Sequence, residues 1–357
     1  LASTWGSGTD GNINVNDAVS WSANKLTLNA THNVYVNAVM TASGSASFAA
    51  NYGHTLDAIG DPTSSVTAGV NADGSPYGMY MAFAKTNGVN DGTFAGSLDF
   101  SGTGSLVLNG QVYTVIQSFN QLISLVTNDA NASGRFTSGS AVGIATGFYA
   151  LGANLDATGF DTAASIANNF YAALPGMSGG LEGLGHTVKN LVINDPPLAA
   201  FGGSIGTDGL VNTNAGALIR NIGMVNTTIT SGPSGGTSPS GGTTGALVGL
   251  NSGNIVNSFV NGATVTVGDS FVGGLAGLSV GSGAIINSYA SNVSVSGAGI
   301  VGGLVGRNDG TITGSYATGN VSTLSAATGA LSIGGLVGLN LGTISSSHAG
   351  LPGVVMV

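Results

Sequence analysis

Apolar and polar residues alternate along this chain in short runs, and the runs recur at fixed intervals. The run INVN at positions 13–16 recurs as VYVN at positions 34–37, a shift of 21 from 13 to 34. LTLN at positions 26–29 is followed by SFAA at positions 47–50, again a shift of 21 from 26 to 47. Alternation with a period of two predicts strands that bury one face. Strand runs that recur at this interval, without a helical pattern, favour the coils of a β-solenoid.

A longer phrase of the form Gly-Leu-Val-Gly-x-Asn recurs in the C-terminal part of the chain. Its four copies begin at Gly245, Gly273, Gly302 and Gly334, so the intervals between successive starts are 28, 29 and 32. A ring-bearing residue follows each start at a nearly fixed distance, delayed only in the second copy by an insertion: Phe259, Tyr289, Tyr316 and His348. Each unit predicts short strands joined by turns. A unit of this size cannot bury its apolar face alone, so the units must stack.

Glycine and asparagine occupy matching positions in these units. Asn-Gly and Asp-Gly pairs supply turns with positive φ, and paired glycines indicate corners where a side chain would collide with the next coil. Asparagines at matching positions predict side-chain ladders along the stack, although asparagine also simply ends strands. Within the strands, Ile312 should point inward between the outward Thr311 and Thr313. The repeat positions are Gly245, Gly273, Gly274, Gly302, Gly303, Gly334, Gly335, Asn251, Asn308 and Asn340.

The middle of the chain, roughly residues 111–190, departs from this rhythm. Apolar residues recur there at helical spacing in two places. They are Ile116, Phe119, Leu122, Ile123 and Val126, and then Ile166, Phe170 and Leu174. We expect two short helices carried on loops outside the rod. The repeat unit near Phe201 is degenerate, because residues 202–206 lack the Leu-Val pair.

These patterns predict an all-β chain that forms one continuous rod with two coil sizes. Residues 1–110 should form N-terminal coils with a period of about 21 residues. Residues 111–200 should form irregular coils with loop or helix insertions. Residues 201–357 should form the longer repeats, with a period of about 28–32 residues.

Composition narrows the class of protein. The chain has 357 residues with 62 Gly, no Cys, 6% charged residues and a net charge of −9. Only six residues are Lys or Arg, so the chain lacks the basic stripe that nucleic acid requires. The absence of Cys excludes a disulfide scaffold and a thiolate metal site. No uninterrupted apolar run is long enough to predict a transmembrane segment.

Candidate catalytic serines and histidines do not form a constellation. The pattern Gly-x-Ser-x-Gly, which can mark a nucleophile, is expected by chance in a chain this rich in Gly and Ser. It occurs at Ser178, Ser234 and Ser279. The histidines are far apart in the sequence and form no zinc motif: His32, His54, His186 and His348.

The acidic residues give little support for a polysaccharide lyase or hydrolase, whose chemistry needs converging acids. Asp156, Asp161, Glu182 and Asp195 could meet beside the irregular middle, but solvated turn carboxylates are the favoured interpretation. We therefore expect no enzyme, no cofactor and no metal centre, with an isolated calcium ion in a turn as the one compatible exception.

The C-terminal units resemble the GLUG-motif repeats of large bacterial surface proteins, through the Gly-Leu-Val-Gly-x-Asn phrase. Residues 180–193 (GLEGLGHTVKNLVI) and 149–156 (YALGANLD) resemble the coils that introduce such repeats. The opening, residues 13–44, resembles the shaft of filamentous-haemagglutinin-like proteins exported by two-partner secretion. The resemblance covers most of the chain. It implies a right-handed parallel β-helix, export through an outer-membrane transporter, and a role in adhesion, aggregation or biofilm.

The chain departs from these families in two ways. His348 stands where the other units have an aromatic residue. The amino-terminal secretion domain of the exported shafts is not evident, so we expect a fragment from further along such a shaft.

The function expected from these observations is that of a segment of an extracellular adhesin on a bacterial surface. Its partner would be a glycan or a cell-surface receptor, and self-association into a fibre or biofilm matrix is the main alternative. A polysaccharide-active enzyme is a second alternative. Recognition generally lies on loops held by a rigid scaffold, so a binding face is sought in the irregular middle and around the aromatic stretch 77–83. The candidate ligand-binding residues are Tyr77, Tyr80 and Phe83.

Overall fold

The computed structural model describes residues 11–55, 62, 69–132, 143–160, 173–195, 207–231, 242–324 and 332–350. This part of the chain is built of β-strands with one α-helix, as the sequence predicts. Two pairs of named strands are antiparallel, and the other named pairs are parallel. The prediction of an all-β fold is confirmed.

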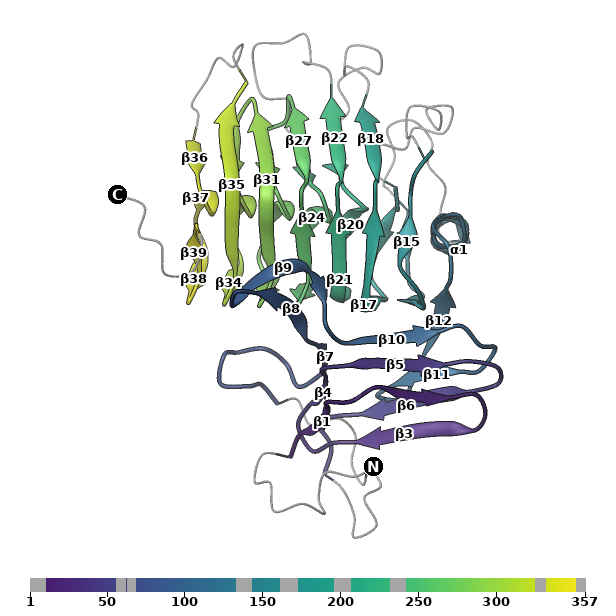
Figure 1. The fold of residues 1–357 in the computed structure, drawn as a ribbon. Helices are drawn as coiled ribbons and strands as arrows, with labels where there is room; N and C mark the ends of the chain where they lie inside the picture. Colours follow the sequence, from purple (N-terminus) through teal and green to yellow (C-terminus); the bar gives the residue numbers. More distant parts are fainter. Residues whose placement is uncertain are drawn as a thin grey trace.

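The strands of residues 13–108, apart from an inserted hairpin, form three coils stacked on one another, which we call the N-terminal stack (Figure 1). Each coil gives one strand to each of three parallel sheets. The first sheet holds β1 (Ile13–Val15), β4 (Val34–Val36) and β7 (Met79–Met81). The second holds β2 (Val19–Trp21), β5 (Val39–Ala42) and β10 (Ser97–Phe100). The third holds β3 (Lys25–Asn29), β6 (Ser47–Asn51) and β11 (Leu106–Leu108).

The strand register confirms one predicted repeat and corrects the other. Ile13 pairs with Val34, which is the predicted shift of 21. Leu26 pairs with Phe48 rather than with Ser47, so the turn between the second and third strands is one residue longer in the second coil. A one-residue slip sends every side chain of a strand to the opposite face. The observed register instead buries Phe48 completely.

Asparagine ladders follow the stacks, as predicted. Asn37 donates from Nδ2 to Oδ1 of Asn16 in the coil before it, at 2.8 Å. In the C-terminal repeats, Asn308 donates in the same way to Asn340, also at 2.8 Å. Each bond joins adjacent coils and satisfies part of a side-chain amide that a strand end leaves without a partner.

Two Asn-Gly hairpins interrupt the parallel coils. The first joins β8 (Phe83–Thr86) to β9 (Val89–Phe94), and the second joins β11 to β12 (Gln111–Ile116). At the second turn Asn109 and Gly110 have φ values of 47° and 74°, the conformation that a two-residue hairpin requires. Here the chain leaves the N-terminal stack, next to the expected boundary at residue 110.

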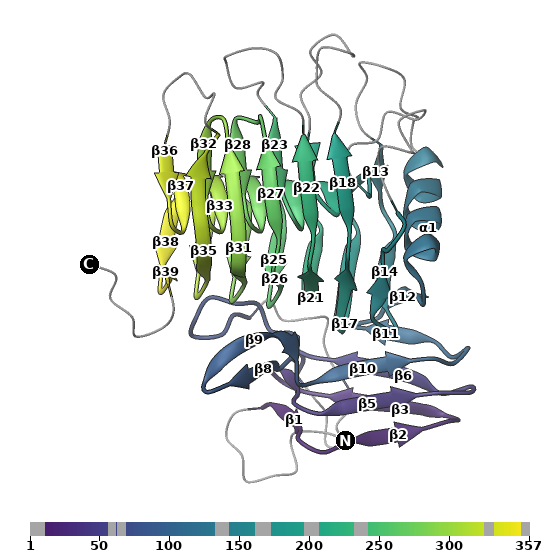
Figure 2. The ribbon, with the colours of Figure 1, turned by 45° about the horizontal axis from the view of Figure 1, so that its top comes forward.

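The remaining coils form a second, longer body, the C-terminal stack, whose strands run crosswise to those of the N-terminal stack (Figures 1 and 2). The expectation of one continuous rod is therefore corrected. The physical reason is the Asn109-Gly110 turn, which reverses the strand direction and prevents β12 from continuing the N-terminal coils. The expected irregular middle, residues 111–200, supplies the first coils of the C-terminal stack.

The described residues of the C-terminal stack form seven coils, one for each strand of its longest simple sheet. That sheet holds β13 (Ile144–Ala145), β16 (Gly176–Met177), β20 (Val211–Asn214), β24 (Val248–Asn251), β29 (Ala276–Ser279), β33 (Val305–Asn308) and β37 (Val337–Asn340). A second sheet holds β19 (Thr207–Asp208), β23 (Thr243–Gly245), β28 (Phe271–Gly273), β32 (Ile300–Gly302) and β36 (Ser332–Gly334).

The third face of the C-terminal stack starts at β12 and runs through all its coils. In the first three coils its strands are β14 (Phe148–Leu151), β15 (Leu155–Asp156), β17 (Gly180–Lys189), β18 (Val192–Asp195), β21 (Leu218–Val225) and β22 (Thr228–Ser231). In the last four they are β25 (Asn254–Val256), β26 (Phe259–Asn261), β27 (Thr264–Val267), β30 (Ala284–Ile286), β31 (Tyr289–Gly297), β34 (Thr311–Thr313), β35 (Tyr316–Thr323), β38 (Thr343–Ser345) and β39 (His348–Ala349).

The repeat glycines lie opposite one another in successive coils. Gly245, Gly273, Gly302 and Gly334 pair in sequence along one sheet. A Cβ atom added to Gly303 would lie 2.1 Å from the carbonyl oxygen of Gly335, which leaves no room for a side chain. Ile312 is fully buried while Thr311 is exposed, as predicted.

The degenerate unit begins later in the chain than its sequence suggests. Residues 201–206 lie outside the described part. The Leu-Val pair is supplied by Leu210 and Val211, both fully buried, and Val211 pairs with Val248 of the next coil. The unit near Phe201 thus contains the expected apolar pair, displaced along the sequence.

The ring-bearing positions of the repeats form one continuous column. The ring centroids of Phe259 and Tyr289 are 5.2 Å apart, those of Tyr289 and Tyr316 4.8 Å, and those of Tyr316 and His348 5.4 Å. All three pairs lie within 12° of parallel. The β8–β9 hairpin covers this aromatic column, because the ring of Phe83 packs edge-on against that of Tyr289 at 5.1 Å.

The first predicted helix is confirmed as α1 (Phe119–Ala132), but it does not stand on a loop outside the coils. It packs against the first coil of the C-terminal stack (Figure 2). Phe119, Leu122 and Val126 enter the buried core there. The helix therefore covers apolar surface that the first coil would otherwise expose to water. The second predicted helix lies outside the described residues, except for Leu174, which pairs with Val211.

Replacement of Leu122 by alanine should uncover the core at this end and lower the free energy of unfolding by about 2–5 kcal/mol. Ser124→Ala on the exposed side of the same helix is the matched control and should change it by about 0.5 kcal/mol or less. Chemical denaturation followed by circular dichroism measures both. Equal stabilities for the two variants would contradict the capping role of α1.

Candidate ligand-binding site at the junction of the stacks

The last coil of the N-terminal stack ends against the side of the C-terminal stack. Its strand β7 is the end strand of the first sheet, so one row of its backbone groups has no neighbouring strand among the described residues. Such a row needs other partners, because unpaired backbone groups in a buried interface are costly. The partners come from a corner of the C-terminal stack that recurs in successive coils.

Asparagines occupy this corner in three successive coils: Asn221, Asn257 and Asn287. Their φ values are 54°, 49° and 49°, in the left-handed region that asparagine tolerates better than most residues. The same corner is occupied by Gly314 in the following coil. The left-handed backbone at this corner favours Asn or Gly, although Ser346 adopts it in the last coil, and asparagine adds an amide directed at β7.

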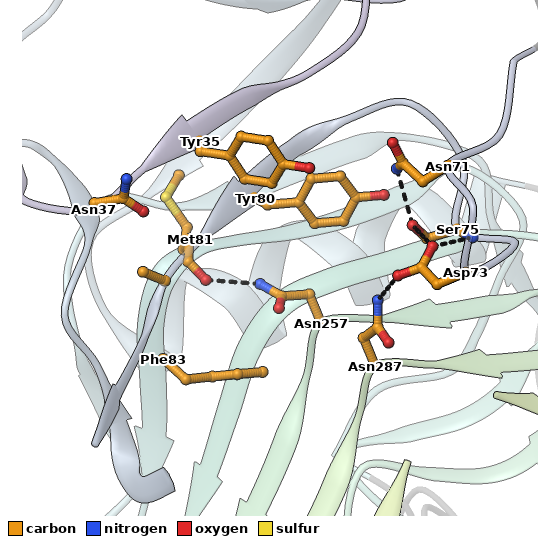
Figure 3. A pocket seen from close by; sticks show the side chains of 11 residues that line it. Tyr35, Asn37, Asn71, Asp73, Ser75, Tyr80, Met81, Phe83, Asn257 and Asn287 are labelled. Atoms are coloured by element: carbon orange, nitrogen blue, oxygen red, sulfur yellow. Dashed lines mark hydrogen bonds between the residues drawn. The ribbon is translucent and has the colours of Figure 1, made fainter. Parts of the chain in front are cut away.

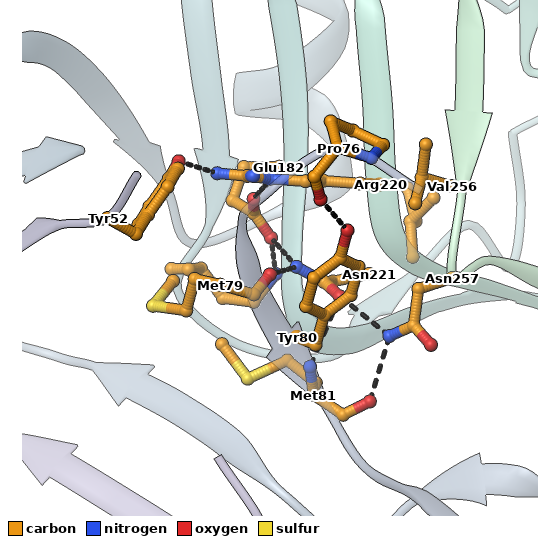
Figure 4. A network of polar contacts seen from close by, with 12 residues as sticks. Tyr52, Pro76, Met79, Tyr80, Met81, Glu182, Arg220, Asn221, Val256 and Asn257 are labelled. Carbon is orange, nitrogen blue, oxygen red and sulfur yellow. Dashed lines mark hydrogen bonds and ion pairs between the residues drawn. The ribbon is translucent and has the colours of Figure 1, made fainter. Parts of the chain in front are cut away.

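The amides of two of these asparagines bind the free edge of β7 (Figure 4). Asn221 donates to the carbonyl oxygen of Met79 at 2.9 Å and accepts from the N–H of Met81 at 3.2 Å. Asn257 donates to the carbonyl oxygen of Met81 at 2.8 Å and to Oδ1 of Asn221 at 2.7 Å. The asparagines therefore act in place of a further strand and join the two stacks.

A buried ion pair lies beside this contact (Figure 4). Arg220 donates through Nε to Glu182 and through Nη2 to the hydroxyl of Tyr52, and Arg220 and Glu182 are 3% and 1% exposed. Burial alone would lower the pKa of Arg220, but the charges of Tyr52 and Glu182 outweigh it and hold that pKa well above its ordinary value. Glu182 also accepts from Asn221 at 2.8 Å, so the buried carboxylate is satisfied.

The other strands of the same coil are held by different partners. The carbonyl oxygen of Leu98 lies 3.1 Å from Nε2 of the buried His186, and the N–H of Phe100 donates to Gly152 at 2.9 Å. Strand β11 pairs with β12. All three strand edges of the last N-terminal coil therefore end on the C-terminal stack.

A cavity of about 260 Å³ lies at this junction (Figure 3). The N-terminal stack contributes strand β7, the beginning of β8, Tyr35 and the loop 71–75. The C-terminal stack contributes Asn257 and Asn287 from the asparagine corner. The cavity therefore exists only where the two stacks meet.

One wall of the cavity is apolar. It consists of the rings of Tyr35 and Tyr80, stacked at a centroid distance of 5.8 Å, together with Met81 and Phe83. Burial raises the pKa of Tyr80 to about 12, so its hydroxyl is neutral at ordinary pH and donates to the carbonyl oxygen of Pro76. The hydroxyl of Tyr35 has no hydrogen-bond partner among the described residues.

The opposite wall is polar. Oδ1 of Asp73 accepts from the N–H of Ser75 at 2.9 Å and from its hydroxyl at 2.6 Å. Oδ2 accepts from Nδ2 of Asn287 at 2.7 Å, a bond that spans the two stacks. Burial raises the pKa of Asp73, but the hydrogen bonds from Ser75 and Asn287 outweigh it and lower the pKa below its ordinary value. The carboxylate is therefore ionised at neutral pH.

Two of the three candidate residues from the sequence, Tyr80 and Phe83, line this cavity. Tyr77 is not part of the lining and stacks instead on His32, at a centroid distance of 4.6 Å. Sequence reasoning missed Tyr35, Asp73, Asn257 and Asn287. A signal existed for the asparagines, because Asn-Ser precedes the aromatic position at residues 257–259 and again at 287–289.

The other chemical candidates remain apart in the described residues. Glu182 is engaged by Arg220 and Asn221, whereas Asp156 binds the N–H of Thr158 at 2.9 Å near the surface. Ser279 is buried and accepts from Asn251 of the neighbouring coil at 3.2 Å. Asp161, Ser234 and the side chain of Asp195 lie outside the described part.

The described residues contain no group of three or more His, Cys, Asp or Glu side chains placed to hold a metal ion. They also contain no helix long and apolar enough to cross a membrane.

Parts of the chain are similar to known proteins. Residues 297–322 match a family model, that of the GLUG motif. Over 151 residues, 41% of this chain, the sequence is 30% identical to halomucin of Haloquadratum walsbyi. The matched region is 2% of the length of halomucin. A solved structure of a candidate immunoglobulin A1 protease from Bacteroides ovatus is 20% identical, with a TM-score of 0.34 over 66% of this chain and 74% of that one.

Replacement of Asn221 by glycine preserves the left-handed backbone and removes only the amide. Several buried polar groups, including those of Met79, Met81 and Glu182, then lose a partner. The free energy of unfolding should fall by about 3 kcal/mol or more, since each such loss costs about 1–3 kcal/mol.

The matched control is Asn226→Gly, because Asn226 has a φ of 53° and is exposed outside the junction. It should change stability by less than about 0.5 kcal/mol. Denaturant melts of both variants measure the difference, and a similar loss in the two would show that the amide of Asn221 does not join the stacks.

Acid should destabilise the junction through His186. Burial lowers its pKa more than the bond to Leu98 and the charge of Asp99 raise it, so the folded chain binds a proton less readily than the unfolded chain. Stability should therefore fall as the pH decreases through the unfolded value of about 6.5. Melting temperatures between pH 7.5 and 5 measure this. His186→Gln should show a weaker dependence, and an unchanged dependence would assign the effect to other groups.

Proposed function

We propose that this chain is a segment of an extracellular surface adhesin. Its shaft consists of right-handed parallel β-helix in two crosswise stacks, and the junction between them forms the binding face. The observation that carries the proposal is the junction cavity, which has one aromatic wall and one polar wall between the two stacks. Binding sites are commonly concave, largely apolar and equipped with a few placed polar groups.

The comparisons support the placement of this chain outside the cell. The GLUG motif and the match to halomucin both favour an extracellular or cell-surface protein. The chain contains no Cys, which suits export in an unfolded state followed by coil formation outside the cell. We extend the proposal to a filamentous-haemagglutinin-like shaft exported by two-partner secretion through an outer-membrane transporter.

The proposal assigns the chain no catalytic step and no cofactor. The single Glu of the sequence is held in the junction ion pair, where its role is structural. The aromatic residues of the cavity are held by both stacks, so the binding face needs no rearrangement to form. A preformed site of this kind avoids the entropy cost of ordering loops on binding.

The fluorescently labelled chain should bind saturably to intact cells, as measured by flow cytometry. Phe83→Ala removes part of the apolar wall and should weaken that binding several-fold. Phe148→Ala is the matched control, since Phe148 packs against Tyr113 away from the cavity lining.

Sedimentation velocity over a concentration series tests the alternative of self-association. A monomer that binds cells supports the proposal. Growth of large assemblies without cell binding would instead make the chain a structural fibre or biofilm-matrix subunit.

A further inference from the structure

We infer that the junction cavity binds a neutral saccharide, with the polar wall around Asp73 and Asn287 holding the hydroxyl groups and the Tyr35–Tyr80–Phe83 wall covering the C–H groups. This inference names the ligand class of the proposed binding face and rests on the proposed function to that extent. Three properties of the cavity support the inference: its size, its charge and the polar atoms there that have no partner among the described residues.

The size of the cavity limits the ligand to a small unit. Its volume of about 260 Å³ lies just below the range of about 300–1,000 Å³ that drug-sized ligands occupy. A single sugar ring, or the end of a glycan chain with the rest in solvent, suits such a volume. A folded protein segment does not.

The cavity keeps both acceptors and donors for a ligand. Both amide hydrogens of Asn257 are used, on Met81 and Asn221, so its Oδ1 remains an acceptor. Asn287 uses one N–H on Asp73 and retains its other N–H and its Oδ1. The hydroxyl of Tyr35 can both donate and accept. Sugar hydroxyls also donate and accept, so they can satisfy this mixed set, whereas an apolar ligand would leave it unpaired.

The charge of the cavity excludes acidic ligands. Asp73 is ionised, and no Lys or Arg is among the lining residues. Sialylated, uronate-containing or sulfated sugars would place a second negative charge beside this carboxylate without a compensating cation. Cationic ligands fit poorly too, because an ammonium or guanidinium group only donates hydrogen bonds and would leave the remaining N–H of Asn287 without an acceptor.

A sugar bound here would contact both stacks. Asp73 belongs to the N-terminal stack and Asn287 to the C-terminal corner, and they already share a bond of 2.7 Å. A hydroxyl group that binds both side chains would therefore add a further bridge between the stacks. We expect the ligand to raise the melting temperature of the whole chain.

The test is binding of the full chain to a printed panel of neutral glucose, galactose, mannose and N-acetylglucosamine oligosaccharides beside sialylated and sulfated counterparts. The best neutral glycan is then titrated by calorimetry into variants. Tyr35→Phe removes the free hydroxyl, and Asn287→Gly keeps the backbone conformation that Gly314 adopts in the next coil. Each should weaken binding about 3- to 10-fold, as expected for one or two lost hydrogen bonds.

The matched controls are Tyr77→Phe, outside the cavity, and Asn226→Gly, at an exposed corner with the same backbone conformation. Both should bind as the unmodified chain does. Selectivity for acidic glycans, equal affinity of all four variants, or no binding of any neutral glycan would overturn the inference.

The same variants separate this inference from the proposed function. One outcome is that the unmodified chain binds cells and that Tyr35→Phe and Asn287→Gly bind those cells equally well. In that case the proposed adhesin role is supported and the saccharide site is contradicted. If the chain binds neutral glycans through the cavity but attaches to no cell, the site stands and the proposed function falls.

Discussion

The structure depends on how the open strand edges of the N-terminal stack find partners. A β-coil leaves a full row of N–H and C=O groups at each end, and these groups would template aggregation if they met water or another chain. At the junction the row on β7 is met by asparagine side chains, and the row on β10 by His186 and backbone groups of the next stack. The N-terminal coils are thereby closed by a body that runs across them.

This closure also explains where the cavity lies. A side-chain amide holds its partner farther from its own backbone than a paired strand would. Two stacks that are joined by asparagine side chains therefore lie farther apart than two paired strands. The Tyr35–Tyr80 pair and the loop that carries Asp73 surround part of that space, and the bond from Asn287 to Asp73 crosses it. The buried pair of Arg220 and Glu182 fixes the opposite side of the contact. The binding face is therefore a consequence of the way the two stacks are joined.

Much of the local structure followed from the sequence. The period-two runs predicted the strands, and the recurring glycine phrase predicted the order in which the coils stack. The helical spacing around Leu122 predicted α1. The relative placement of the stacks did not follow, because periodicity describes one coil against the next and says nothing about a change of direction. The Asn109-Gly110 pair between two apolar runs is the strongest short-range hairpin signal, and it marks that change. No sequence pattern marks Asp73, because its position in the cavity depends on a tertiary contact with Asn287.

Amide hydrogen exchange at the capped edges tests most directly whether the two stacks form one body. If they do, the N–H of Met81, bound to Asn221, and the N–H of Phe100, bound to Gly152, should exchange as slowly as ladder amides inside the N-terminal stack. Exchange of both amides at the rate of an exposed strand edge would contradict the account. The stacks would then move independently, and no preformed cavity would lie between them.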